Sequence, residues 1–268
     1  LGESSQFVIL MEAKLAIELG ADIFGSVASV HSHSDGHKSS ISGPGVGNYI
    51  TMAKCTADAE KDLGLKLLRQ NTFVHAHGTG TPANRTTESH ILNEIANTFG
   101  IKNWPITAIK SYLGHSMAPA SGDQLIASLG TWNKGIIPGI HSTDALADDV
   151  YAEHLDILLE DKTEEQNFYK GCFLNAKGFG GNNASAFILS PEETQIKMKS
   201  LVTKNKYNQY LKNTGETQKK SAQYNRSCLK GDYQVTYKFN ENVLNGETDI
   251  EISRKGMKLK GFKKPIKF

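Results

Sequence analysis

Two histidine motifs, separated by a lysine, contain the residues of this sequence best suited to chemistry. His77 stands in His-Gly-Thr-Gly-Thr-Pro, Lys110 follows a short apolar run, and His115 stands in Gly-His-Ser. A neutral histidine ring can donate a hydrogen bond to an enolate oxygen without carrying a stable charge itself. A nearby lysine can orient such a site and tune the pKa of the histidines. The series therefore favours stabilisation of an enolate or oxyanion.

A glycine-rich block occupies residues 175–184, with Phe179 between Gly178 and the pair Gly180 and Gly181. Glycines without Cβ atoms let the backbone approach a substrate closely. A tight turn before a core strand is the structural alternative. The Gly-x-Gly-x-x-Gly spacing is absent from this block, so we expect no dinucleotide-binding fingerprint there.

In this order, the motifs resemble the second half of a β-ketoacyl-acyl-carrier-protein synthase, the condensing enzyme of fatty-acid and polyketide synthesis. The resemblance implies that the histidines and the lysine handle a malonyl group on a carrier protein. It gives the Phe179 backbone N–H half of an oxyanion hole and its ring a gating role. It also assigns Thr79 and Thr81 to the phosphopantetheine arm of the carrier, and Glu88 to the family's glutamate position eleven residues after His77.

Each of these residues also has a purely structural interpretation. The histidines would then be core or capping residues, and Lys110 would form an ion pair, for example with Glu88. Thr79 and Thr81 would stabilise a turn through side-chain-to-backbone hydrogen bonds.

Three departures from the family pattern concern substrate length and subgroup more than catalytic class. Arg85 stands where the family has an aspartate, and Lys177 stands directly before Gly178. After His115, residues 117–122 read Met-Ala-Pro-Ala-Ser-Gly instead of the usual Gly-Ala-Ala-Gly.

The elements that must position these residues alternate between strands and helices. Strands are expected at 7–11, 23–30, 72–76, 106–109, 171–175 and 184–189, and helices at 12–19, 48–63, 87–99 and 122–132. Such alternation indicates an α/β domain with ligand groups at strand ends. The resemblance implies a thiolase-like layered α-β-α-β-α fold. It covers about residues 1–190, which would form the synthase domain, with 1 to about 35 finishing its first half and about 36–190 forming the second.

Composition narrows the class of protein further. The 268 residues are 38% hydrophobic and 22% charged, and the widely spaced Cys55, Cys172 and Cys228 form no zinc or disulfide pattern. No apolar run reaches the ~20 residues of a membrane span, and no signal peptide is visible. We therefore expect a cytoplasmic protein. His31, His33 and His37 crowd one loop, but without flanking ligands we expect no metal there.

Residues 191–268 are expected to form a separate basic extension. Residues 196–268 hold 17 Lys and Arg against 6 Asp and Glu, a balance of +11, whereas residues 1–195 have a balance of −9. We expect irregular chain up to residue 229, and then a possible β-hairpin around Asn245-Gly246, with arms at 233–239 and 248–252. Docking of an acidic carrier protein and a merely solvated surface both explain the charge.

Three functions follow from the resemblance. The first is decarboxylative condensation of malonyl-carrier with an acyl thioester; the family's nucleophilic cysteine would lie upstream, so the chain alone would not condense. The second is a catalytically silent partner or chain-length factor, and the third is a malonyl-thioester decarboxylase. The expected partners are acyl carrier protein and a second synthase subunit, in a homodimer or heterodimer, without nucleic acid. No cofactor is expected on the chain itself, since the substrate is carried on phosphopantetheine.

Overall fold

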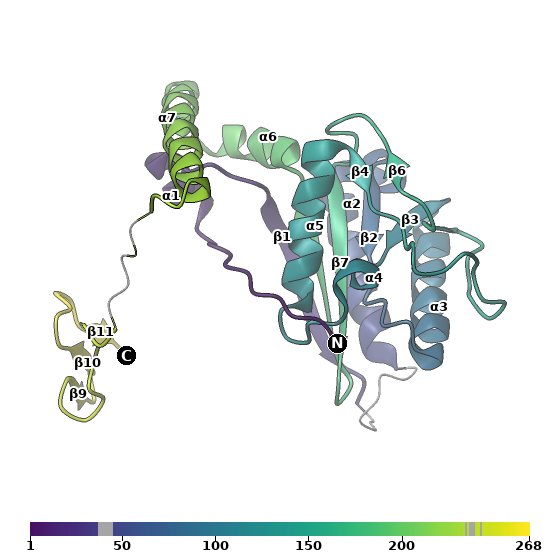
Figure 1. Ribbon diagram of the computed structural model, residues 1–268, viewed down its shortest axis with the longest axis horizontal. Coiled ribbons are helices and arrows are strands. Elements are labelled where there is room, and N and C mark those ends of the chain that lie inside the picture. Colours follow the sequence, from purple (N-terminus) through teal and green to yellow (C-terminus); the bar gives the residue numbers. More distant parts are fainter. Residues whose placement is uncertain (37–44, 234, 236–238, 242) are drawn as a thin grey trace. The chain divides into compact units, whose positions relative to one another are not determined.

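The computed structural model describes residues 1–36, 45–233, 235, 239–241 and 243–268, and a six-stranded mixed sheet forms the core of its larger unit, residues 1–217 (Figure 1). The strand order is β1-β8-β7-β2-β3-β5, with β7, β2, β3 and β5 parallel and β8 antiparallel to both its neighbours. These strands are β1 (Ser26–Ser34), β2 (Thr72–His75), β3 (Trp104–Thr107), β5 (Leu155–Ile157), β7 (Gly171–Gly178) and β8 (Asn182–Leu189). The short strands β4 (Ile136–Ile137) and β6 (Lys162–Thr163) pair beside it.

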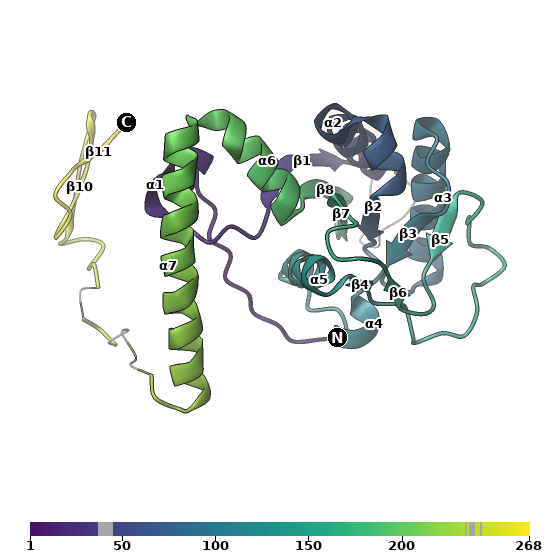
Figure 2. The ribbon, with the colours of Figure 1, turned by 90° about the horizontal axis from the view of Figure 1, so that it is seen from above.

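Helices cover both faces of this sheet, and alternate side chains of each strand enter two different cores. Val74, Phe173 and Phe187 point into the core formed with α2 (Val46–Gln70) and α3 (Pro82–Phe99). Phe73, Cys172 and Ile188 enter the core on the other face, with Trp132 of α5 (Ala120–Lys134). Figure 2 shows the sheet between these helices. Both faces are buried, as parallel strands require.

The parallel strands deliver their loops to one edge of the sheet. His77 follows the carboxyl end of β2, and Lys110 opens the one-turn helix α4 (Lys110–Leu113) that follows β3. Helix α3 begins at Pro82, five residues before its predicted start, because Pro82 occupies its first turn and Thr81 caps it. The cap shortens the loop between His77 and the helix to a few residues.

The predicted strand at 7–11 is wrong. Residues 1–12 have no regular secondary structure, and the Phe7 side chain is 95% exposed. An apolar run indicates burial only when a neighbouring surface covers it, and none of the described residues does so here. Helix α1 (Ala13–Leu19) follows as predicted and ends at Gly20 in the left-handed conformation. Strand β1, expected to finish the first half of the domain, pairs with β8 in the main sheet.

The chain divides into two compact units, residues 1–217 and 218–268. The prediction of irregular chain after residue 191 is wrong, because α6 (Pro191–Leu201) and α7 (Lys204–Leu229) occupy most of 191–229. Within the first unit, Tyr207 and Tyr210 of α7 pack with Ile17 of α1 and Met198 of α6. Two tyrosines thus anchor a helix that is otherwise almost entirely polar.

The second unit contains a three-stranded sheet of β9 (Ile250–Ser253), β10 (Gly256–Leu259) and β11 (Ile266–Lys267). A hairpin does form here, but β9 pairs with β10 across Arg254 and Lys255, not across Asn245-Gly246. Most of the predicted first arm, at 234 and 236–238, lies outside the described residues. The boundary at residue 190 remains a prediction.

Candidate active site

The His77 loop is held by one buried carboxylate. Glu88 on α3 accepts hydrogen bonds from the backbone N–H of His77 at 2.6 Å and of Gly78 at 2.9 Å. Asn84 and Asn175 donate their side-chain N–H groups to the same carboxylate, at 2.9 and 2.7 Å. Burial acts to raise the pKa of Glu88, but His77 and these donors outweigh it and lower the pKa below its usual range. The carboxylate therefore stays ionised and fixes the loop.

Gly78 allows two loops of the site to approach each other. Its φ of 54° is left-handed, and a Cβ atom there would lie 2.5 Å from the Cβ of Ala108, which follows β3. Any other residue would be both strained and obstructed at this position. The glycine of the His-Gly-Thr motif thus lets the β2 and β3 loops meet.

Lys110 contacts the backbone of the His77 loop rather than Glu88. Its ammonium donates to the carbonyl oxygen of His77. The ion pair between Lys110 and Glu88 that the structural alternative proposes is therefore not formed. The Glu88 oxygens instead accept hydrogen bonds from four other N–H groups. Burial lowers the pKa of Lys110, while Glu88 and Asp123 act in the opposite direction.

His77 is fixed as a neutral donor. The backbone N–H of Lys177, at the end of β7, donates to its Nδ1 at 3.3 Å, which leaves the proton of the neutral ring on Nε2. Burial, followed by the charges of Lys110, His115 and Lys177, lowers the pKa of His77 to about 4 against the opposing effect of Glu88. The ring is thus neutral throughout the physiological range.

His115 has the same tautomer in a more open position. Its Nδ1 accepts from the backbone N–H of Met117 at 3.1 Å, so its proton also lies on Nε2. Burial and Lys110 lower its pKa. The two histidine rings meet edge to face with their centroids 5.5 Å apart. Two neutral Nε2–H donors from separate loops are therefore brought together.

A second carboxylate supports the His115 loop. Asp123 of α5 accepts from Ser116 Oγ at 2.5 Å and from Ser4 Oγ at 3.1 Å, and also from the Gln6 amide. The backbone N–H of Gly2 donates to the His115 carbonyl at 3.0 Å. The N-terminal segment therefore lies along this loop and helps to hold it.

The glycine-rich turn follows Lys177, whose backbone contacts His77, and its residues 178–180 are exposed. Gly180 and Gly181 have left-handed φ angles of 79° and 73°, the Phe179 ring is 67% exposed, and Asn182 donates to the Phe179 carbonyl at 2.9 Å. The backbone N–H that donates to His77 belongs to Lys177, two residues before Phe179. Gly178 is exposed and uncrowded. The oxyanion-hole and gating roles of Phe179 remain predictions.

The two threonines differ in position. Thr81 caps α3, with its Oγ1 accepting from the Asn84 N–H at 3.4 Å, as the structural alternative proposes. Thr79 lines the cavity beside Lys110, and its hydroxyl lies 3.4 Å from that of Thr81. Their contact with a phosphopantetheine arm remains a prediction.

Neither Cys55 nor Cys172 has the environment of a nucleophile. Cys55 and Cys172 are fully buried, and burial raises their pKa to about 11 and about 12. Cys228 lies on the second unit's part of α7.

The described ranges contain no group of three or more His, Cys, Asp or Glu able to hold a metal ion. His31 pairs with Asp58 at 2.7 Å and His33 contacts the Ser34 carbonyl, whereas His37 lies outside the described residues. Within those ranges there is also no helix with the length and apolar content needed to cross a bilayer.

Comparison with known proteins agrees with the motifs. Residues 24–144 match the family described as "Beta-ketoacyl synthase, C-terminal domain". The chain is 45% identical over 266 residues to the beta-ketoacyl-[acyl-carrier-protein] synthase FabY of Pseudomonas aeruginosa, covering 99% of this chain and 42% of that protein. This chain belongs to the β-ketoacyl synthase family. It corresponds to the C-terminal part and spans about two fifths of the length of FabY.

The structural comparison confirms the predicted fold class. The crystal structure of FabY from P. aeruginosa matches with a TM-score of 0.86 at 43% identity, over 96% of this chain and 40% of that one. The α/β architecture is thus that of the thiolase-like ketosynthases. The 3-oxoacyl-[acyl-carrier-protein] synthase 1 of Haemophilus influenzae is 30% identical over 66% of this chain and 40% of its own length.

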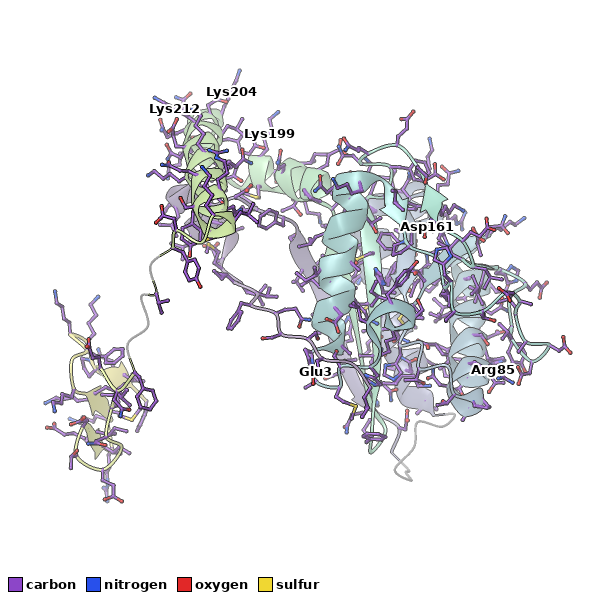
Figure 3. All side chains as sticks on the ribbon, viewed as in Figure 1. Glu3, Arg85, Asp161, Lys199, Lys204 and Lys212 are labelled. Carbon is purple, nitrogen blue, oxygen red and sulfur yellow. The ribbon has the colours of Figure 1, made fainter. Side chains whose placement is uncertain are left out.

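The basic extension is shared with FabY, so the expectation that the resemblance ends near residue 190 is wrong. The similarity to FabY covers nearly the whole chain, whereas that to the H. influenzae synthase covers two thirds. Figure 3 labels three lysines of this extension, Lys199 on α6 and Lys204 and Lys212 on α7. Strand β8 ends at Leu189, which pairs with Gly171 at the start of β7, and α6 follows that end. His77 contacts Lys177, which lies at the opposite end of β7. These lysines therefore lie beyond the sheet edge opposite the histidines.

Proposed function

We propose that this chain supplies the malonyl-handling half of a condensing enzyme. The enzyme would join malonyl-carrier to an acyl thioester with release of carbon dioxide. The observation that carries the proposal is the pair of neutral Nε2–H donors on His77 and His115, whose ring centroids lie 5.5 Å apart. Hydrogen bonds to the malonyl thioester oxygen would strengthen as it becomes an enolate oxygen, which lowers the barrier to decarboxylation.

The remaining steps follow from that enolate. The carboxylate leaves as carbon dioxide, and its bonding electron pair forms the enolate. The enolate carbon attacks the acyl thioester, a new carbon–carbon bond forms, and the thiolate leaves. Lys110 would hold the His77 backbone and add positive charge, and the Phe179 N–H would stabilise the oxyanion of the attacked thioester. The family's nucleophilic cysteine would come from upstream sequence.

The substrate would be carried on phosphopantetheine of an acyl carrier protein, with Thr79 and Thr81 beside the arm. In one solved complex, a type II PKS acyl-carrier protein is bound to its ketosynthase, which is 20% identical to this chain. We further propose a cytoplasmic enzyme that pairs with a second synthase subunit. The boundary between the synthase domain and the basic extension would fall near residue 190, and that extension would be available for a carrier or another acidic partner.

Malonyl-thioester decarboxylation without condensation is a second candidate for the 268-residue chain alone. It is favoured by the burial and raised pKa of Cys55 and Cys172, which leave neither thiol able to accept an acyl group. Incubation with an acyl thioester and measurement of intact mass tests this point. No adduct is expected, and a stable acyl adduct on any of the three cysteines would reassign the nucleophile.

The main proposal is tested in the full-length synthase that contains this chain. Carbon dioxide release from malonyl-carrier and formation of β-ketoacyl product are measured with and without an acyl donor. Both are expected with the donor. Carbon dioxide release without any β-ketoacyl product would assign decarboxylation alone, and absence of both would reject the proposal in favour of a catalytically silent partner.

A further inference from the structure

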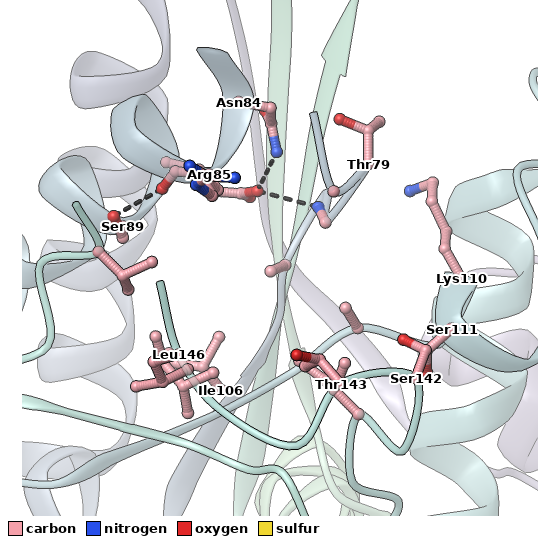
Figure 4. Close-up of a pocket in the computed structure, with 18 of the residues that line it drawn as sticks. Thr79, Asn84, Arg85, Ser89, Ile106, Lys110, Ser111, Ser142, Thr143 and Leu146 are labelled. Carbon is pink, nitrogen blue, oxygen red and sulfur yellow. Dashed lines mark hydrogen bonds between the residues drawn. The ribbon is translucent and has the colours of Figure 1, made fainter. Parts of the chain in front are cut away.

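The second compact unit, residues 218–268, has no buried side chain among its described residues. The first unit, by contrast, covers its apolar strand residues, and Ile106 beside the pocket shown in Figure 4 is only 4% exposed. A small sheet is stable in water only when it buries a hydrophobic face. The three-stranded sheet of the second unit therefore needs a covering surface that its own described residues do not supply.

Five apolar residues share one face of this sheet, because directly paired residues and residues two apart in a strand point the same way. They are Met257 and Leu259 of β10, Ile250 and Ile252 of β9, and Ile266 of β11. Lys258 and Glu251 pair on the opposite face. Ile252 is 73% exposed and Ile266 is 47% exposed, so the apolar face is open.

The same sheet carries cations that have no counter-charge. Lys258 and Lys260 form ion pairs with Glu251 and Asp249, at 3.7 and 3.1 Å. The other basic residues of the sheet and its loops are exposed and form no ion pair with any described residue. They are Arg254 and Lys255 in the β9–β10 turn, Lys263 and Lys264 in the loop before β11, and Lys267 in β11. Positive charge therefore lies at both ends of the strands.

Charge and apolar character together select the partner. Residues 218–268 hold 12 Lys and Arg against 5 Asp and Glu, a balance of +7, so two copies of the unit would repel each other. Phe262 and Phe268, which stand among the lysines, are 65% and 75% exposed. A protein partner would need a fitted pocket for each ring, whereas a lipid surface receives rings wherever they lie. Basic clusters beside exposed apolar groups are typical of sites for anionic lipids.

We propose that residues 249–268 bind an anionic lipid surface. The apolar face of the sheet and the two phenylalanine rings would enter the boundary between headgroups and acyl chains. The five cations without a counter-charge would contact lipid phosphates, with their alkyl stems lying along the apolar face. The inference goes beyond the proposed function, because it uses no residue of the histidine site.

Co-sedimentation of the full-length synthase with lipid vesicles tests the proposal. The vesicles contain phosphatidylcholine alone, or phosphatidylcholine and phosphatidylglycerol in equal amounts. Binding is expected to the mixed vesicles only, and it should weaken between ~0.1 and ~1 M salt as the Debye length shortens from ~10 to ~3 Å. Lys263→Gln combined with Lys264→Gln should lower partitioning about thirtyfold, since each lysine near the surface contributes about fivefold. Lys66→Gln combined with Lys102→Gln, at exposed positions of the first unit, is the matched control and should bind normally.

A second pair of variants tests the apolar contribution. Phe262→Ser combined with Phe268→Ser should lower partitioning about tenfold or more, because both rings leave the lipid boundary. Melting curves and malonyl decarboxylation, unchanged in all variants, would show that lost binding is not unfolding. Unchanged partitioning in both double variants, or equal binding to the two kinds of vesicle, would overturn the proposal.

Two other occupants of the apolar face have distinct outcomes in the same experiments. No vesicle binding, with weaker affinity for acyl carrier protein in the lysine variant, would assign the face to an acidic protein. No vesicle binding, with a lower melting temperature in the phenylalanine variant, would show that another part of the same chain covers the face. Either result would contradict lipid binding.

Discussion

The two histidine loops are supported in different ways. In the first loop His77 itself is buried, and a single carboxylate, Glu88, collects four N–H donors from three parts of the chain. The His115 loop is more exposed, and its carboxylate, Asp123, depends on hydroxyl and amide side chains of Ser116, Ser4 and Gln6. One loop is fixed by the core, whereas the other is fixed through an irregular segment. The difference predicts that His77 is held rigidly and that His115 can adjust.

The largest expected effect is on chemistry, at the histidines themselves. In the full-length synthase, His77→Ala and His115→Ala should each lower malonyl-carrier decarboxylation by ~10²–10³, because each removes one donor to the enolate oxygen. His154→Ala, outside the site, is the control. Rates near wild type in both site variants would show that neither ring stabilises the enolate.

The next effect is on stability and separates the two supporting carboxylates. Glu88→Gln places an amide N–H among four donors in a buried position, and should lower the free energy of unfolding by about 3 kcal/mol. Asp123→Asn should cost about 1 kcal/mol, because its partners are hydroxyl and amide groups of flexible side chains. Chemical denaturation measures both, with Glu94→Gln on the exposed face of α3 as control. Equal losses at Glu88 and Asp123 would remove the contrast between the loops.

A smaller effect concerns pH. His75, at the end of β2, is fully buried, and burial, with a smaller effect of Lys110, lowers its pKa to about 3. Between pH 3 and 6.5 the unfolded chain binds a proton that folded His75 does not, so stability falls as pH falls through this window. This group should therefore make the free energy of unfolding about 2 kcal/mol lower at pH 5 than at pH 8.

Replacing that ring should flatten the pH dependence. His75→Phe keeps an aromatic side chain beside Phe73 and removes the titrating group. Denaturation at pH 5 and pH 8 should then show a difference about 2 kcal/mol smaller than in the parent. His33→Ala, at an exposed position of β1, should leave the difference unchanged. An unaltered slope in His75→Phe would assign the acid sensitivity elsewhere, with His77 the next group to test.

Sequence patterns predicted the elements that carry the site, because each depends on local periodicity. The strands at 72–76 and 106–109 and the helix at 122–132 all occur within a few residues of their predicted limits. The supporting residues were not predictable in the same way. Asn175 meets Glu88 across 87 positions, and Gln124 donates to the carbonyls of Ala76 and Asn175 at 2.9 and 3.1 Å. Such contacts exist only once strands β2 and β7 lie side by side.

Two of the errors of secondary structure have related causes. The run Phe7–Met11 is apolar but has no covering surface among the described residues. Helix α7 has few large apolar residues, yet Tyr207 and Tyr210 suffice to pack it against α1 and α6. In both places tertiary contact, or its absence, overrode the composition of the segment.

A double-mutant cycle on decarboxylation tests most directly whether the two histidines act together on one oxygen. His77→Ala, His115→Ala and the double variant are compared in the full-length synthase, with malonyl-carrier as substrate. Groups that act as a unit are strongly non-additive. We predict that the double variant loses little more activity than the worse single variant. Two separate losses that multiply in the double variant would show independent roles and contradict the account.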